Sequence, residues 1–176
     1  DVAAAVDDVG SRPDEVPVDL GRLVVLGHSS GGQLALWTGG RAGLPPGTVG
    51  ASPGVRPQSV VALAPVSDLT GCADQGALDG TCAAVMGGSP QELPGRYART
   101  SPLARVPIGL PQRLFHGQVD TVVPIDQSRA YVAAAAAAGD DATLTEQPDA
   151  NHFTVLEPKS AAWGAVRDGV DQLLGR

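Results

Sequence analysis

Residues 23–36 read LVVLGHSSGGQLAL. The apolar run 23–26 predicts a buried strand, and the sequence GHSSG at residues 27–31 has the pattern Gly-x-Ser-x-Gly directly before a predicted helix. A serine on such a sharp strand-to-helix turn projects its hydroxyl away from the sheet, and the glycines remove Cβ atoms that would crowd the turn. The start of the helix adds unpaired N–H groups and a positive dipole end. Ser29 is therefore a candidate nucleophile.

Length and charge restrict the remaining possibilities. With 176 residues the chain can bury a substantial core, and we expect a single domain over residues 1–176. The net charge of -7 comes from 12 basic and 19 acidic residues without a basic cluster, which argues against nucleic acid and anionic membranes as partners. The sequence contains no apolar run of about 18 residues, the length typical of a membrane span.

The two cysteines, Cys72 and Cys82, lie in one Gly-rich segment. Two cysteines without a histidine between them do not make a zinc site, so we expect no metal. We also expect no cofactor. The sequence leaves a disulfide and two free thiols equally open. We expect a cytoplasmic protein, or an exported one if Cys72 and Cys82 are bonded.

Hydrophobic patterning predicts strands that alternate with helices. Strands are predicted at 23–26, 60–64, 113–116 and 143–146, and helices at 2–10, 30–41, 91–98, 125–138 and from 158 onward. A polar turn with a proline follows the first helix, and residues 65–111 are otherwise predicted to be rich in loops. The alternation predicts an α/β fold, a parallel sheet with helices on both faces.

In an open parallel sheet the ligand lies beyond the carboxyl ends of the strands. Ser29 follows the first predicted strand, Asp120 the third and His152 the fourth. A histidine can take the proton of a serine hydroxyl, and a buried carboxylate fixes the tautomer of that histidine. We therefore expect His152 within hydrogen-bond reach of Ser29, with Asp120 behind it. Asp68, after the second strand, is the second candidate for the acid.

Five segments together resemble the C-terminal half of the α/β-hydrolase family. They are residues 27–32 (GHSSGG), 65–69 (PVSDL), 101–103 (SPL), 116–124 (HGQVDTVVP) and 151–153 (NHF). Within the family they are most similar to small bacterial esterases near the kynurenine formamidase and prolyl oligopeptidase branches. The resemblance implies Ser29 as nucleophile, Asp120 as acid, His152 as base and the Ser30 N–H as an oxyanion donor.

The resemblance has further implications. The N-terminal strands of the fold and the second oxyanion donor would lie upstream of Asp1, missing from this chain. An upstream part of the same protein or another chain would then pair with strand 23–26. Residues 69–99 correspond to a variable, cap-like excursion, while His28 and His116 are expected to be structural histidines.

The activity that the resemblance implies is that of a carboxylesterase-like serine hydrolase. It would cleave a carboxylic ester or small amide through an acyl-serine intermediate, with a small molecule as its substrate. Two alternatives remain open: a peptidase of the prolyl oligopeptidase type and a non-catalytic binding module on the same fold.

Overall fold

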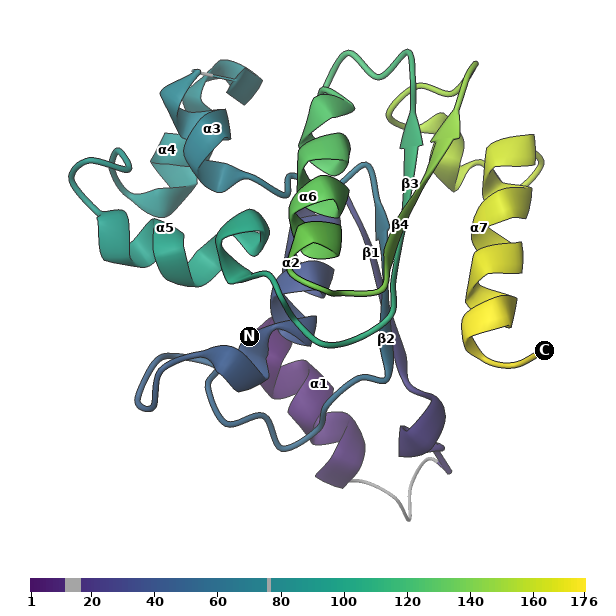
Figure 1. Cartoon of the computed structure of the whole chain (residues 1–176), viewed down its shortest axis with the longest axis horizontal. Coiled ribbons are helices and arrows are strands. Elements are labelled where there is room, and N and C mark those ends of the chain that lie inside the picture. Colours follow the sequence, from purple (N-terminus) through teal and green to yellow (C-terminus); the bar gives the residue numbers. More distant parts are fainter. Residues whose placement is uncertain (12–16, 76) are drawn as a thin grey trace.

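A parallel sheet of four strands forms the centre of the computed structural model, which describes residues 1–11, 17–75 and 77–176 (Figure 1). The strands lie in the order β1-β2-β3-β4, and each neighbouring pair is parallel. Their bounds are Val24–His28 for β1, Ser59–Leu63 for β2, Gln112–Gly117 for β3 and Ala142–Gln147 for β4. All four strands lie where the sequence predicted them, to within two residues at either end.

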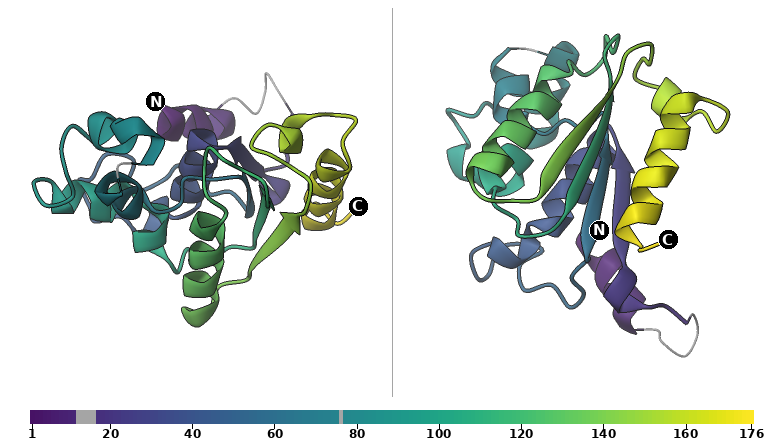
Figure 2. Two further views of the ribbon diagram at one scale, coloured as in Figure 1. Left: turned by 90° about the horizontal axis from the view of Figure 1, so that it is seen from above. Right: turned by 45° about the vertical axis from the view of Figure 1, so that its right-hand side comes forward.

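Helices cover both faces of this sheet, as predicted. The α-helices of the described residues are α1 (Val2–Ser11), α2 (Ser30–Gly39), α3 (Leu69–Asp74), α4 (Thr81–Met86), α5 (Pro94–Thr100), α6 (Asp126–Ala137) and α7 (Ala161–Leu173). Figure 2 shows α2 and α6 on one side of the sheet and α7 on the other. The α/β fold class is confirmed.

The core has one layer on each face because successive residues of a strand point to opposite sides. Every residue of β2 is buried. Val60 and Ala62 pack with the helices α2 and α6, whereas Val61 and Leu63 pack toward α7. A strand buried on both faces explains why β2 reads as a continuous apolar run.

The segment between β2 and β3 contains more helix than predicted. One helix was predicted there, at 91–98, but the structure has α3, α4 and α5. The helices α3 and α4 have 6 residues each, too few to show a helical period, and the disulfide between Cys72 and Cys82 links them. The three helices lie beside α2 and α6 at one end of the molecule (Figure 1).

Three helices differ from their predicted bounds by two residues or more. Helix α5 begins at Pro94, three residues after the predicted start, and ends at Thr100, two residues after the predicted end. The last helix begins at Ala161 instead of near Pro158, because the Ser160 hydroxyl caps it by accepting the Trp163 N–H at 3.0 Å. Helix α2 ends at Gly39, two residues before the predicted end. The polar turn predicted after α1 falls on residues 12–16, which lie outside the described residues.

Helix α1 is held by polar contacts. None of its residues is buried, although its valines predicted an apolar stripe. The guanidinium of Arg41, only 2% exposed, pairs with the Asp7 carboxylate at 2.6 Å. A buried cation needs such a partner, so this ion pair fixes α1 beside α2. None of the described helices is long and apolar enough to cross a membrane.

Candidate active site

A strained backbone turn carries Ser29 between β1 and α2. Its φ of 56° and ψ of -119° lie outside the regions that a serine ordinarily adopts. A Cβ atom at Gly27 would overlap the carbonyl of Gly31, and one at Gly32 would lie 2.9 Å from Cβ of Pro65. Around Gly31 itself there is open space. The expectation that Gly31 relieves crowding is therefore wrong, and Gly32 has that role.

The hydroxyl of Ser29 is not used to hold the turn. The backbone N–H of Ser29 donates to the Leu63 carbonyl at 2.8 Å, and its carbonyl accepts from the Gln33 N–H at 3.0 Å. The side chain does not cap α2, and the described residues form no hydrogen bond with its hydroxyl. The N–H of Ser30, the first residue of α2, likewise has no backbone partner in the described part of the chain. Both groups remain available to a substrate.

Asp120 and His152 form a hydrogen-bonded pair beyond β3 and β4. The distance between His152 Nδ1 and Asp120 Oδ2 is 2.7 Å, and both side chains are at most 4% exposed. A carboxylate only accepts hydrogen bonds, so the proton of His152 is on Nδ1 and the lone pair is on Nε2. That tautomer is the one required of a general base. The hydrogen bond expected between His152 and Ser29 is absent from the described residues.

The carboxylate of Asp120 accepts three hydrogen bonds and has a further contact with a histidine nitrogen. Its Oδ1 accepts the backbone N–H groups of Val122 at 2.8 Å and Val123 at 2.9 Å. Its Oδ2 contacts His152 and also His116 Nε2 at 3.2 Å. Burial by itself would raise the pKa of Asp120, but the hydrogen bonds from His152, Val123 and Val122 outweigh it and lower this pKa. The group is thus held as an anion.

His116 contacts the carboxylate of Asp120 directly, which the sequence does not predict. Its Nε2 also lies 2.9 Å from the Val123 carbonyl, so this nitrogen carries the proton. Its Nδ1 then accepts the Ser128 hydroxyl at 2.8 Å. Burial lowers the pKa of His116 below its ordinary value, which keeps the ring neutral. The signal in the sequence is the spacing of four residues between His116 and Asp120.

His28 connects the serine turn to the loop of His152. Its Nε2 donates to the backbone carbonyl of His152 at 2.8 Å, and the two rings lie 4.5 Å apart between centroids. Burial lowers the pKa of His28. Because His28 directly precedes Ser29, this contact places the turn and the Asp120–His152 pair side by side. The sequence predicts His28 only as a structural histidine and does not indicate this contact with the distant His152.

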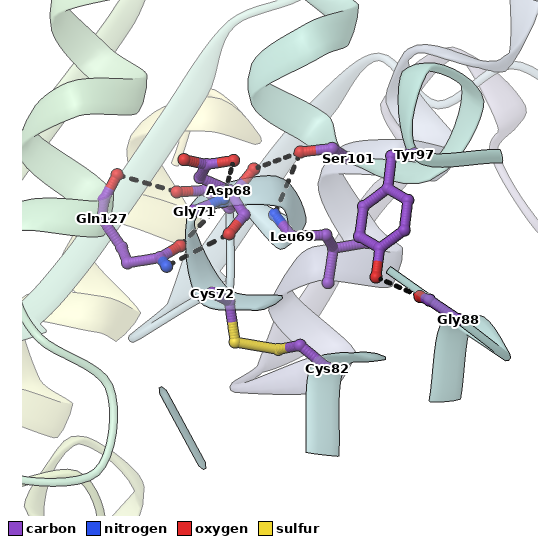
Figure 3. Close-up of a disulfide and its surroundings, with 10 residues drawn as sticks. Asp68, Leu69, Gly71, Cys72, Cys82, Gly88, Tyr97, Ser101 and Gln127 are labelled. Atoms are coloured by element: carbon purple, nitrogen blue, oxygen red, sulfur yellow. Dashed lines mark hydrogen bonds between the residues drawn. A yellow bond between two sulfur atoms is a disulfide. The ribbon is translucent and has the colours of Figure 1, made fainter. Parts of the chain in front are cut away.

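Asp68 is a helix cap. Its carboxylate accepts the Gly71 N–H at 3.0 Å at the start of α3, and its own N–H donates to the Gln127 amide oxygen at 2.7 Å (Figure 3). It is Asp120, and not Asp68, that contacts His152. The described residues contain no group of three or more His, Cys, Asp or Glu side chains placed to hold a metal ion.

Solved structures with the same fold include several hydrolases. An acetyl ester-xyloside bifunctional hydrolase from Caldicellulosiruptor lactoaceticus has a TM-score of 0.76 and 23% identity, over 98% of this chain and 63% of that one. A truncated carbohydrate esterase from gut microbiota has a TM-score of 0.83 and 23% identity, over 99% of this chain and 67% of that one. A puromycin hydrolase has a TM-score of 0.69 and 26% identity, over 99% of this chain and 24% of that one.

The comparisons also define the family. This chain spans 63% of the length of the first of these structures, and no curated protein matches it. The model of one family, described as BD-FAE, matches residues 1–134, which is more than half of the chain. Together with the strand-turn-helix at Ser29 and the parallel sheet, this match shows that the chain belongs to the BD-FAE family and has the α/β-hydrolase fold.

Proposed function

We propose that this protein is a serine hydrolase that cleaves a carboxylic ester or small amide through an acyl-serine intermediate. The observation that carries the proposal is the 2.7 Å contact between Asp120 and His152, joined to the serine turn through His28. It supplies a base of fixed tautomer next to a serine whose hydroxyl forms no hydrogen bond in the described residues. The hydrolase neighbours support the same chemistry.

The proposed reaction has two half-reactions. His152 Nε2 takes the proton of the Ser29 hydroxyl as Oγ attacks the substrate carbonyl carbon. The tetrahedral intermediate then expels its alcohol or amine, which receives that proton from His152. A water molecule then gives a proton to His152 and attacks the acyl-serine carbonyl carbon. The second tetrahedral intermediate expels Ser29 Oγ, which takes that proton back from His152, and the acid is released. The hydrogen bond from Ser29 to His152 would form once substrate is bound, since such bonds are often long in free enzymes.

Each neighbouring group has a defined part in this scheme. The N–H of Ser30 would donate to the oxygen that becomes negative in the tetrahedral intermediate. Loss of one such donor typically costs about 3 to 4 kcal/mol of transition-state stabilisation. The anionic Asp120 would stabilise the His152 imidazolium, while His116 and the amides of Val122 and Val123 hold that carboxylate in place.

A fluorophosphonate probe tests the nucleophile, because it forms a covalent bond with an activated serine. We expect labelling of the wild type and of Ser30→Ala, which keeps its backbone N–H, and no labelling of Ser29→Ala. Labelling that persists in Ser29→Ala would exclude Ser29 as nucleophile. A correctly folded wild type that neither reacts nor hydrolyses any substrate would favour the binding module.

The leaving group is tested with a matched pair of substrates. The proposal places esters first, so p-nitrophenyl acetate should be hydrolysed faster than the corresponding p-nitroanilide. A reversed order, with cleavage of peptide anilides, would favour a peptidase of the prolyl oligopeptidase type.

The disulfide bears on the compartment in which the protein works. The Cys72–Cys82 disulfide favours the exported alternative, because such bonds persist in oxidising compartments. Secretion into the medium would support it, and purely cytoplasmic protein with free thiols would contradict it.

A further strand would pair along β1, which lies at the edge of the described sheet with Leu26 43% exposed. That strand would come from other residues of the same protein or from another chain. Slow hydrogen exchange at the outward amides of β1 is expected. Fast exchange there would exclude the pairing.

A further inference from the structure

An apolar cavity of about 400 Å³ lies between α2 and the helices α3 and α4. Its volume falls within the about 300–1,000 Å³ typical of small-molecule sites. The apolar side chains that form its wall include Leu34, Trp37, Val66, Leu69 and Met86. The disulfide closes one side, since Cys82 lines the cavity and its bond to Cys72 ties α4 to α3 (Figure 3).

The cavity begins next to the proposed nucleophile. Ser30, Leu34 and Trp37 line it from one face of α2, where residues four and seven positions after Ser30 lie on the same side as Ser30. Val66 also lines the cavity, and its N–H donates to the carbonyl of Ser29 at 3.3 Å. A substrate whose carbonyl lies at Ser29 can therefore extend one substituent into this space.

Three of the polar side chains in the wall donate hydrogen bonds to the protein backbone. Gln33 donates its amide N–H to the Thr100 carbonyl at 2.9 Å, and the indole N–H of Trp37 donates to the Arg99 carbonyl at 2.9 Å. Arg96 donates to the Met86 carbonyl. These contacts direct the polar atoms into α5 and its surroundings, so that the cavity is suited to a neutral, apolar group.

The position of His152 decides which end of the substrate this group belongs to. In the proposed reaction His152 protonates the leaving oxygen, so the alcohol must lie on the side of His152. None of His152, Phe153 and Asp120 lines the cavity. The substituent that enters it is therefore the other one, the acyl chain.

We propose that the cavity between α2 and α3–α4 binds an aliphatic acyl chain of medium length, such as octanoyl. The inference rests on the proposed function. In this proposal the helices of the 69–99 segment form the wall that determines which acyl groups fit. Each buried methylene contributes about a fourfold gain in binding, so two buried methylenes already give about sixteenfold. The kcat/KM for p-nitrophenyl octanoate should therefore exceed that for the acetate at least about tenfold.

Variants connect this preference to the cavity. Leu34→Asn puts an amide into the wall, and Val85→Asp puts a carboxylate at its exposed rim, where Val85 is 79% exposed and the fold tolerates a charge. Both should lower the octanoate-to-acetate ratio about fivefold or more. Val49→Asp, at a valine that is 88% exposed and outside the cavity, is the matched control and should leave the ratio unchanged. Equal octanoate-to-acetate ratios of kcat/KM in the wild type and all three variants would overturn the inference.

Binding without hydrolysis separates this inference from the proposed function. Trp37 lines the cavity, so saturation with 2-decanone should shift its fluorescence to shorter wavelength, and Trp37→Phe should remove the shift. A shift without hydrolysis of any ester would refute the hydrolase and leave the cavity as an apolar binding site. Hydrolysis of both esters at similar kcat/KM without a shift would refute the cavity assignment and leave the hydrolase. A higher kcat/KM for octyl acetate than for ethyl acetate, with equal kcat/KM for p-nitrophenyl octanoate and acetate, would assign the cavity to the alcohol and overturn the inference.

Discussion

Replacing Asp120 with Asn should abolish most activity while the fold persists. The amide oxygen of Asn can take the place of Oδ1 and still accept from the Val122 and Val123 N–H groups. The NH2 group then replaces Oδ2, where it faces His152 Nδ1 and His116 Nε2. Since NH2 donates, His152 must turn Nδ1 into an acceptor and carry its proton on Nε2, so it can no longer take the proton of Ser29.

The size of this effect follows from the contacts that are lost. Two contacts with a charged group disappear, the hydrogen bond from His152 at 2.7 Å and the contact from His116 at 3.2 Å. At about 1.5–3 kcal/mol for each, they are together worth about 3–6 kcal/mol. At about 1.4 kcal/mol per tenfold this predicts a kcat about 10² to 10⁴ lower, in line with about 10⁴ for the same change in a serine protease.

The assay is kcat for a p-nitrophenyl ester, with thermal unfolding measured in parallel to confirm the fold. Asp68→Asn is the matched control, because Asn caps a helix about as well as Asp and Asp68 only caps α3. A loss below tenfold in Asp120→Asn, or an equal loss in Asp68→Asn, would refute the assignment of the acid.

Three further predictions concern the surroundings of the site. Gly27→Ala should prevent folding, because its Cβ would overlap the Gly31 carbonyl. Gly31→Ala should leave the free energy of unfolding in urea unchanged or raise it by up to about 1 kcal/mol. A folded Gly27→Ala together with a destabilised Gly31→Ala would contradict the geometry of the turn. His28→Ala should lower kcat about tenfold or more with little change in the melting temperature, since the carbonyl of His152 loses its donor; an unchanged kcat would exclude a positioning role. Burial lowers the pKa of His116 in the folded protein. As the pH falls below about 6.5, His116 is therefore protonated in the unfolded chain but not yet in the folded one. The free energy of unfolding should decrease from about pH 6.5 down to the pKa of His116 in the folded protein. His116→Gln should flatten this decrease, and a slope equal to that of the wild type would refute it.

The features that the sequence predicted well are those that depend on local patterns. The strand β2 reads as an apolar run because it is buried on both faces. The strand β1 reads as the same kind of run, but it lies at the edge of the described sheet and none of its residues is fully buried there. Ser29, Asp120 and His152 could be proposed together because each follows a strand, and the carboxyl ends of parallel strands share one edge. The pairing of Asp120 with His152 follows from that topology.

Other features depend on contacts between distant residues, and no local pattern encodes them. The helices α3 and α4 are too short for a helical period, and the disulfide between them could be considered only as one of two possibilities. The contact of His28 with the His152 carbonyl spans 124 positions. The glycine pattern was also ambiguous: Gly31 belongs to the motif but meets open space, whereas Gly32, outside it, packs against Pro65.

The chain has three histidines, and their hydrogen bonds indicate which one can act as the base. His116 has a partner at each ring nitrogen, Ser128 at Nδ1 and both Val123 and Asp120 at Nε2, so it has no lone pair to offer. His28 uses Nε2 on a neutral carbonyl, which stabilises its imidazolium much less than a carboxylate would. His152 alone combines a 2.7 Å contact to the carboxylate with a second nitrogen that has no hydrogen bond in the described residues. Because a base must both offer a lone pair and be stabilised once protonated, these contacts favour His152 over the other two.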